Sequence, residues 1–307
     1  MSETETQPQP LTESQIRLIR LAGLASVSVA LTLIALKVYA SLATGSIAML
    51  SSLADSLLDL LASLMTLLAV RFALEPADRE HRFGHGKLEA VAGLTQALII
   101  LGSAAYVSFH AIERLISPAP VAEPGIGTIV MIISLMLTIG LVAFQTMVVR
   151  RTGSVAIGAD ELHYRVDVLT NIAVLVAIGA SSGLGWHYAD PVLGLVIVVV
   201  ILFSVREIVT RVLDILLDRE LPAASRAEII AIARSHEEVY GVHDLRTRTS
   251  GTHEFIQFHL ELDPKLTLAR VHEISDEVEK EVMARFPRAE VIIHADPYGL
   301  VEPQDNF

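Results

Sequence analysis

Cysteine is absent from the 307 residues, so the chain can form neither a disulfide nor a thiolate metal site. This absence is compatible with a reducing cytoplasm. Basic residues are also scarce, with 23 Lys and Arg against 35 Asp and Glu. The acidic excess argues against nucleic acid as a partner and fits a protein that handles cations.

A signal peptide is not expected at the N-terminus. Residues Met1–Glu13 form a polar tail without a cationic segment, and the first apolar run lacks a small-residue cleavage site. We therefore expect that run to be retained as a helix.

Hydrophobic residues make up 52% of the chain and the mean hydropathy is +0.53, which excludes an ordinary soluble enzyme. Runs long enough to cross a bilayer, about 20 residues each, recur through the first two thirds. Six spans are predicted, at Ile16–Ala43, Ala48–Leu74, Leu88–Ile116, Ile126–Val149, Ala156–Ser182 and Pro191–Leu217.

Loop charge predicts the orientation of these spans. The loop after the second span carries Arg79, Arg82 and Lys87, and the loop after the fourth carries Arg150 and Arg151. Lys and Arg are absent from the intervening loops, 43–46, 117–127 and 182–190. The positive-inside rule then places both termini in the cytoplasm of a multi-pass protein of the inner (plasma) membrane.

Beyond the spans, short amphipathic segments predict a small soluble domain. Its expected elements are a helix at Arg226–Glu237, strands at Val239–Thr247 and Glu254–Leu262 joined by a turn at Ser250-Gly251, a helix at Leu268–Phe286 and a strand at Ala289–His294. The order αββαβ indicates an open sheet with its helices on one face. The expected organisation is a polar tail (1–15), a six-helix membrane domain (16–217), a cytoplasmic tail domain (218–300) and a C-terminal tail (301–307).

Ionisable residues interrupt two of the predicted spans. Asp55 and Asp59 lie in the second, and His163 and Asp167 lie in the fifth, each pair at i, i+4 on one helix face. A charge at the centre of a bilayer costs roughly 2.5–3.5 kcal/mol even on a lenient scale. Because both pairs fall near the midplane, we interpret them as one four-ligand site. The alternative is that they line a wet crevice or join helices by hydrogen bonds.

One imidazole and three carboxylates suit tetrahedral zinc and tolerate iron, cobalt, cadmium or manganese. Three carboxylates close together in a low dielectric cannot all stay ionised, so the site holds protons when it holds no metal. A metal requires deprotonated ligands and therefore displaces those protons when it binds. This exclusivity is what metal–proton antiport requires, with His163 as the expected proton carrier.

Three segments, Ala54–Asp59, Pro76–Lys87 and Leu162–Asp167, closely resemble the cation diffusion facilitator family. The nearest branch is the bacterial zinc and ferrous-iron efflux proteins, and the resemblance runs from about Leu21 to Pro297. It implies a tail domain with a metallochaperone-like (ferredoxin-like) fold. It also implies that Asp55, Asp59, His163 and Asp167 form the transport site.

The resemblance further implies two other metal sites and an ion pair. Asp78, His81 and His85 match a loop site, although an ordinary solvated cluster is the alternative. A binuclear tail site that helps to join two protomers matches His243, His259, His272, His294 and Asp296. Lys87 and Asp218 match a pair that couples the two domains. Ala295 stands where relatives often carry glutamine, which leaves the ligands on either side unchanged.

The function expected from these observations is proton-coupled efflux of a divalent metal by a homodimer. Zn²⁺ is expected as both transported and structural ion, with Fe²⁺ or Cd²⁺ as other transported ions. A metalloenzyme is disfavoured because no HExxH motif occurs. The main alternative is a membrane-bound metal sensor without transport, which would not need ionisable residues at the midplane. A channel would favour weaker, multi-site binding.

Overall fold

The computed structural model describes residues 11–44, 47–116, 126–184 and 188–299. The expected C-terminal tail at 301–307 and most of the polar N-terminal tail lie outside these residues. Six long helices make up the first two thirds: α1 (Glu13–Thr44), α2 (Ile47–Ala73), α3 (Lys87–Ile116), α4 (Ile126–Thr152), α5 (Val155–Leu184) and α6 (Ala189–Leu216). This confirms the predicted membrane-helical fold.

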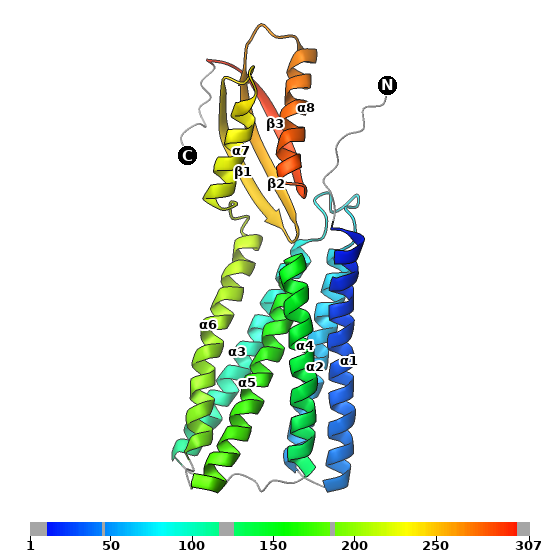
Figure 1. The fold of residues 1–307 in the computed structure, drawn as a ribbon, viewed down its shortest axis with the longest axis vertical. Helices are drawn as coiled ribbons and strands as arrows, with labels where there is room; N and C mark the ends of the chain where they lie inside the picture. The colour runs from blue at the N-terminus through cyan, green and yellow to red at the C-terminus, as the bar shows by residue number, and fades with distance from the viewer. Residues whose placement is uncertain (1–10, 45–46, 117–125, 185–187, 300–307) are drawn as a thin grey trace.

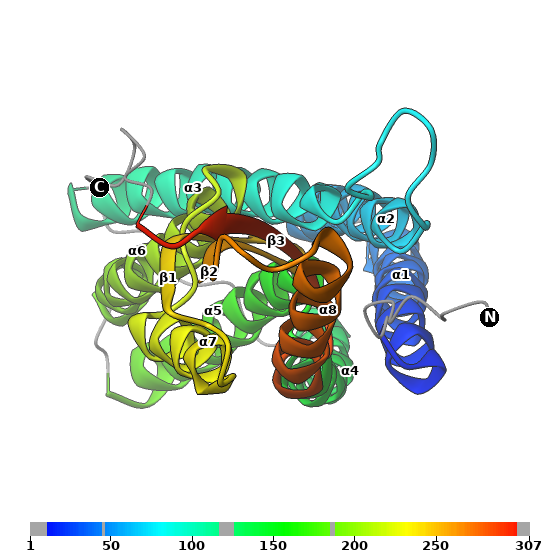
Figure 2. The same cartoon turned by 90° about the horizontal axis from the view of Figure 1, so that it is seen from above.

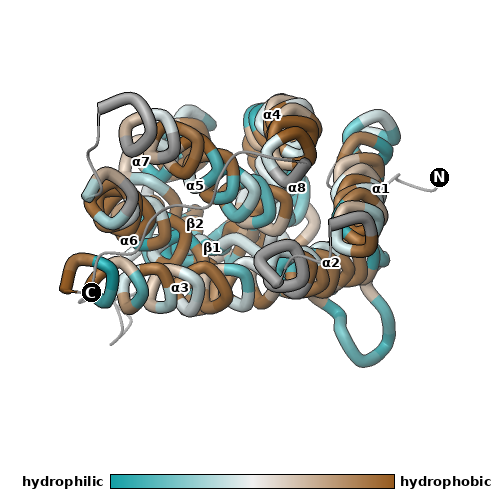
Figure 3. The backbone as a smooth tube through the Cα atoms, turned by 90° about the horizontal axis from the view of Figure 1, so that it is seen from below, coloured by the Kyte–Doolittle hydropathy of each residue, from teal (hydrophilic) through white to brown (hydrophobic). Residues whose placement is uncertain are grey.

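Five of these helices are long and apolar enough to cross a membrane: α1, α2, α3, α4 and α6. The remaining helix, α5, is as long as α3 but carries several charged residues in its first half. Figure 3 shows that the helices are largely hydrophobic, whereas the loop between α2 and α3 is hydrophilic.

The bundle is held by three apolar clusters, each of which includes residues of α5. One joins α1, α2, α4 and the start of α5, and includes Ile19, Val70 and Ile157, all fully buried. The other two join α3, α5 and α6, the larger of them through Ile100 and Ile201. Since α5 contacts all five other helices, it is the central helix of the bundle, and it carries half of the expected transport site.

The tail domain stacks on one end of the bundle (Figure 1). Its elements are α7 (Ala223–Ser235), β1 (Gly241–Ser250), β2 (His253–Leu262), α8 (Leu268–Arg285) and β3 (Ala289–Pro297). The predicted order αββαβ is confirmed. The central strand β2 pairs antiparallel with β1 and parallel with β3.

The alternating apolar residues of β2 form the core of the tail domain. Ile256, Phe258 and Leu260 are at most 1% exposed and pack with Ile274 and Val278 of α8. Both helices therefore cover one face of the sheet, as expected, and Figure 2 shows them side by side above the bundle.

Several strand and helix ends differ from the predicted ones. The two strand ends differ because backbone pairing between strands continues beyond the residues whose pattern predicts a strand. Strand β1 runs to Ser250, which pairs with His253, so the hairpin turn is tighter than predicted. Strand β3 runs past His294 to Pro297, which pairs with Leu262. Helix α4 continues through Arg150 and Arg151, which the sequence analysis assigned to a loop. Cations in the last turn of a helix are favoured by its dipole.

Candidate metal-binding sites

Two neighbouring helices bring three of the four expected transport ligands together. Asp59 extends from α2, and His163 and Asp167 extend from α5 one turn apart. His163 Nε2 lies 3.0 Å from Asp59 Oδ1 and 3.9 Å from Asp167 Oδ2. Ligand atoms of all three residues lie within 4.8 Å of one another. Residues 104 positions apart in the chain thus converge on one point within the bundle.

The spacing of these atoms suits a transition metal. Two ligands 2.0–2.2 Å from a tetrahedral zinc are about 3.3–3.6 Å apart, and the two histidine–carboxylate distances bracket that range. One imidazole and two carboxylates leave a fourth position for another ligand.

Asp55 lies outside this three-residue group. It is exposed on α2, one turn from Asp59, and the structure does not bring it within the shared ligand distance. The adjacent side chain, Ser56, is fully buried and accepts a hydrogen bond of 2.6 Å from Lys37 Nζ of α1. Lys37 Nζ also donates to the carbonyl oxygen of Ser52 at 3.1 Å. A cation is therefore held against the turn of α2 that carries Asp55.

Three buried acids near the start of α5, Glu89, Asp160 and Glu161, were missed by the sequence analysis. Glu89 of α3, 2% exposed, accepts hydrogen bonds from the backbone N–H of Val155 at 2.8 Å and from Ser154 Oγ at 3.0 Å. It satisfies the first N–H of α5 and so fixes where that helix begins. Asp160, fully buried, lies one turn before His163. Asp160 could have been identified by the signal used for His163, an ionisable residue within a predicted span.

The loop between α2 and α3 holds the second expected cluster. Asp78 Oδ1 lies 3.4 Å from His81 Nδ1, and Asp78 Oδ2 lies 3.4 Å from His85 Nε2. The Asp78 carboxylate also accepts the backbone N–H groups of His81 at 2.6 Å and Glu80 at 2.8 Å. The backbone hydrogen bond from His81 lowers the pKa of Asp78. An ionised carboxylate and two imidazoles thus meet at the surface, where they could hold a metal.

In the tail domain, strand register assembles the third cluster. His243 of β1 is the cross-strand partner of His259 of β2, which is the partner of His294 of β3. Such neighbours project from the same face of the sheet. Asp296, 8% exposed at its side chain, lies beside them, with Oδ2 2.7 Å from His259 Nδ1 and 3.4 Å from His243 Nε2. Its other oxygen is 3.1 Å from His294 Nε2.

One expected tail ligand lies apart from this cluster and one unexpected residue joins it. The His272 side chain is 69% exposed on α8 and pairs with Asp276, Nδ1 to Oδ1 at 3.4 Å. Asp244, which the sequence analysis did not select, has Oδ2 3.7 Å from His259 Nε2. The register of β1 and β2 is irregular between His243 and Arg246, and Asp244 has φ +46°. That irregularity reorients Asp244, and nothing in the sequence signals it.

The expected inter-domain pair is formed at the junction of bundle and tail domain. Lys87 Nζ, at the start of α3, lies 2.9 Å from Asp218 Oδ1, just beyond α6. Arg248 of β1 approaches the same oxygen to 3.4 Å. Partial burial opposes ionisation of Asp218, but the two cations, Lys87 foremost, outweigh it and lower the pKa of this carboxyl.

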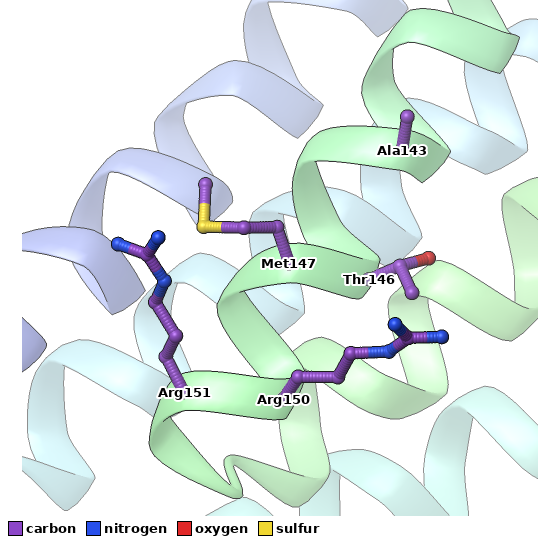
Figure 4. Close-up of a pocket in the computed structure, with 5 residues that line it drawn as sticks. All are labelled: Ala143, Thr146, Met147, Arg150 and Arg151. Carbon is purple, nitrogen blue, oxygen red and sulfur yellow. The ribbon is translucent and has the colours of Figure 1, made fainter.

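A further depression lies on α4 and is lined by Ala143, Thr146, Met147, Arg150 and Arg151 (Figure 4). Its lining comes from one helix, and the two arginines project to either side of Met147. It contains none of the clustered ligands and so adds no metal site.

Comparison with known proteins finds family models that match the helical bundle and the tail domain. The family model described as the cation efflux transmembrane domain matches residues 23–217, and that of the cation efflux protein cytoplasmic domain matches residues 221–298. The cation-efflux pump FieF of Escherichia coli (strain K12 / DH10B) is 47% identical over 291 residues, which cover 95% of this chain and 97% of the relative. FieF of Shigella flexneri serotype 5b is 46% identical over the same shares.

Among solved structures, the metal-bound C-terminal domain of the CzcD transporter from Thermotoga maritima is 32% identical. The match covers 26% of this chain and 93% of that one, with a TM-score of 0.25.

Proposed function

The chain belongs to the cation diffusion facilitator family of cation efflux proteins, and we propose that it exports a divalent transition metal in exchange for protons. It is a multi-pass membrane transporter and not an enzyme. The proposed cargo is Zn²⁺, with Fe²⁺ or Cd²⁺ as other ions that the same ligands would accept.

One observation carries the proposal: Asp59, His163 and Asp167 converge inside a bundle of apolar helices. Ionisable groups within membrane helices are costly and mark ion pathways. We assign Asp55 as the fourth ligand, reached by a rotamer change or a small shift of α2, since it lies one turn from Asp59 on the same helix.

Proton exchange follows from the chemistry of the ligands. Metal binding needs His163 neutral and the carboxylates ionised, so each metal that enters releases the protons held there. Carboxylates gathered in a low dielectric regain protons when the metal leaves. The site is therefore occupied by metal or by protons, and each passage of metal one way moves protons the other way.

The remaining assignments concern the assembly and its orientation. We propose a homodimer joined through the tail domain, which matches the cytoplasmic-domain family model and holds structural Zn²⁺ at the His243, His259, His294 and Asp296 cluster, with His272 as a further ligand. The loop cluster of Asp78, His81 and His85 is proposed as a metal site as well. We propose that both termini lie in the cytoplasm and that the bundle spans the inner membrane.

The experiment that tests this function is metal uptake into proteoliposomes that enclose a pH-sensitive dye and a metal indicator. Wild type should move zinc with counter-flow of protons. Asp59→Asn should abolish both fluxes, and Asp55→Asn should weaken zinc binding by more than the roughly 10- to 100-fold typical of losing an outer-shell partner. The matched control is Glu207→Gln, which removes an exposed acid from α6 and should transport normally.

Each outcome has a distinct meaning. Zinc binding without any flux in the wild type would favour a membrane-bound sensor, whose ligands do not alternate between the two sides. Iron or cadmium flux without zinc flux would reassign the cargo. Normal zinc flux in Asp59→Asn would contradict the assignment of the transport site.

A further inference from the structure

Asp160 joins four helices through hydrogen bonds to its carboxylate. Ser26 Oγ of α1 donates to Oδ2 at 2.7 Å and Gln145 Nε2 of α4 donates to the same oxygen at 2.6 Å. Gln96 Nε2 of α3 donates to Oδ1 at 3.2 Å. Asp160 makes no ion pair among the described residues, and all of its hydrogen-bond donors are neutral. A buried carboxylate without a cation is costly and calls for a specific role.

A chain of hydroxyl groups also connects α2, and a second residue of α5, to Asp160. Ser63 of α2 lies with its Oγ 2.8 Å from Ser26 Oγ and 2.8 Å from the Tyr164 hydroxyl of α5. Each hydroxyl has one hydrogen to donate, and an ionised carboxylate only accepts. Ser26 Oγ is therefore placed to donate either to Asp160 or to Ser63, but to only one of them at a time, and Tyr164 joins the chain through Ser63. We call Ser26, Ser63, Gln96, Gln145, Asp160 and Tyr164 the polar layer.

Ser63 and Asp160 of the polar layer lie one helical turn from the transport site, on the side of the tail domain, while Tyr164 follows His163 directly in α5. On α2, which runs toward the tail domain, Ser63 follows Asp59 by four residues. On α5, which runs away from it, Asp160 precedes His163 by three residues. A turn of helix advances 5.4 Å, so both helices place the layer at a similar depth between the site and the tail domain.

Burial differs sharply across this one turn. The side chains of Asp59 and Asp167 are 17% and 34% exposed, and Asp55, further from the tail domain, is exposed. Every residue of the polar layer is at most 2% exposed. The His163 side chain is 6% exposed, so it is the carboxylates of the site that are more accessible than the layer on its tail-domain side.

The hydrogen-bonding capacity of the polar layer is not fully used. Gln96 Oε1 and Gln145 Oε1 are buried and have no hydrogen-bond partner among the described residues. Gln96 Nε2 has two hydrogens and lies within hydrogen-bond distance of three acceptors, Thr66 Oγ1, the Ala62 carbonyl oxygen and Asp160 Oδ1. An unpartnered buried carbonyl destabilises the arrangement that contains it. Such an arrangement suits a contact that must break and re-form better than it suits a permanent brace.

We propose that Asp160 is a positioning residue that holds the polar layer together as the closure of the transport site toward the tail domain. Metal reaches Asp59, His163 and Asp167 from that side when Ser26, Gln96 and Gln145 release this carboxylate. The inference rests on the proposed transport function for its role, since it identifies the barrier that an alternating carrier needs on one side of its site. The geometry of closure itself does not depend on the identity of the metal.

The absence of cysteine allows a direct test by thiol labelling. Asp59→Cys places the only thiol at the transport site, and a membrane-impermeant maleimide is applied to either face of oriented membrane vesicles. Arg79→Cys in the loop between α2 and α3 reports whether the reagent reaches the tail-domain face. The labelling rate is then measured in Asp59→Cys alone and combined with Ser26→Ala or Asp160→Asn.

With the layer intact, we expect labelling from the face opposite the tail domain to be faster than from the tail-domain face. Ser26→Ala and Asp160→Asn each remove one hydrogen bond or more, and should speed labelling from the tail-domain face by roughly 2- to 10-fold. The matched control is Ser28→Ala on the same helix, which should change nothing. Among the described residues, the exposed Ser28 hydroxyl bonds only to the Leu24 carbonyl of its own helix.

Two results would overturn the proposal: equal labelling of Asp59→Cys from both faces, or an unchanged tail-domain rate in both layer variants. Unchanged labelling from the opposite face shows that a variant is folded, so a merely destabilised variant is recognised. Zinc flux of the wild type is measured in parallel. If that flux is absent, the proposed function fails while the labelling still decides whether the layer closes the site.

Discussion

Gly86 and Gly251 pack backbone against backbone where the bundle meets the tail domain. A Cβ atom on Gly86 would lie 2.3 Å from the carbonyl oxygen of Ser250, and one on Gly251 would lie 2.8 Å from the carbonyl oxygen of Gly86. Gly251 also has φ +64°, a conformation that other residues rarely adopt. Beside this contact, Arg248 lies over the rings of Phe83 and Phe255 at 4.6 and 4.4 Å. The loop that carries Asp78, His81 and His85 is therefore in direct contact with the sheet.

Replacing Gly86 with alanine should loosen this junction. The added methyl group meets backbone atoms, which cannot move aside as a flexible side chain would, so we expect a loss of about 1–3 kcal/mol. Thermal unfolding of the purified protein and limited proteolysis between α6 and the tail domain measure the effect. Gly102→Ala is the control, because nothing lies within 4 Å of its Cβ position, and an unchanged melting temperature in Gly86→Ala would refute the close contact.

The pair of Lys87 and Asp218 should make the junction sensitive to acid. The pKa of Asp218 lies below its ordinary value, so its contribution is present above about pH 4 and is lost as the pH falls through the folded-state pKa. Both side chains are more than a third exposed, so solvent screening limits the contribution to about 0–1 kcal/mol. Unfolding measured from pH 7 to pH 3 should therefore show a smaller loss of stability in Asp218→Asn than in the wild type. Equal pH dependence of the two proteins would count against the pair.

The tail histidines should differ in their effect on zinc binding. His259 contacts Asp296 and has histidines on both neighbouring strands, so His259→Ala should remove zinc from the tail cluster. His272 is exposed and pairs with Asp276 on its own helix, so as a further ligand it should matter less, and His272→Ala should weaken zinc binding less than His259→Ala. Isothermal titration of the full-length protein with zinc measures both stoichiometries. A loss of bound zinc in His272→Ala equal to that in His259→Ala would show that His272 reaches the cluster, for example from a partner protomer.

The helices and strands were predictable because their signals are local. Span length follows from the run of apolar residues, and the alternation of Ile256, Phe258 and Leu260 with polar neighbours specified the buried face of β2. The ends of β1 and β3 moved because cross-strand pairing continues past the residues whose pattern signals a strand.

The candidate sites were predictable in part. Asp59, His163 and Asp167 stood out because charge in an apolar span needs a compensating reason, and the structure brings them together. That Asp55 and His272 stand apart, and that Asp244 approaches His259, depends on side-chain direction and on a strand irregularity. Neither feature can be inferred from the spacing of residues in the sequence.

By itself, the sequence determined the class of this protein: six apolar runs, acids and a histidine within two of them, and a histidine-rich αββαβ tail. These follow from hydropathy and periodicity, which act over a few residues. Only the tertiary structure decided which helices Asp160 joins. Those contacts depend on hydrogen bonds between residues such as Ser26 and Asp160, 134 positions apart, whose distances are set by the packing of five helices.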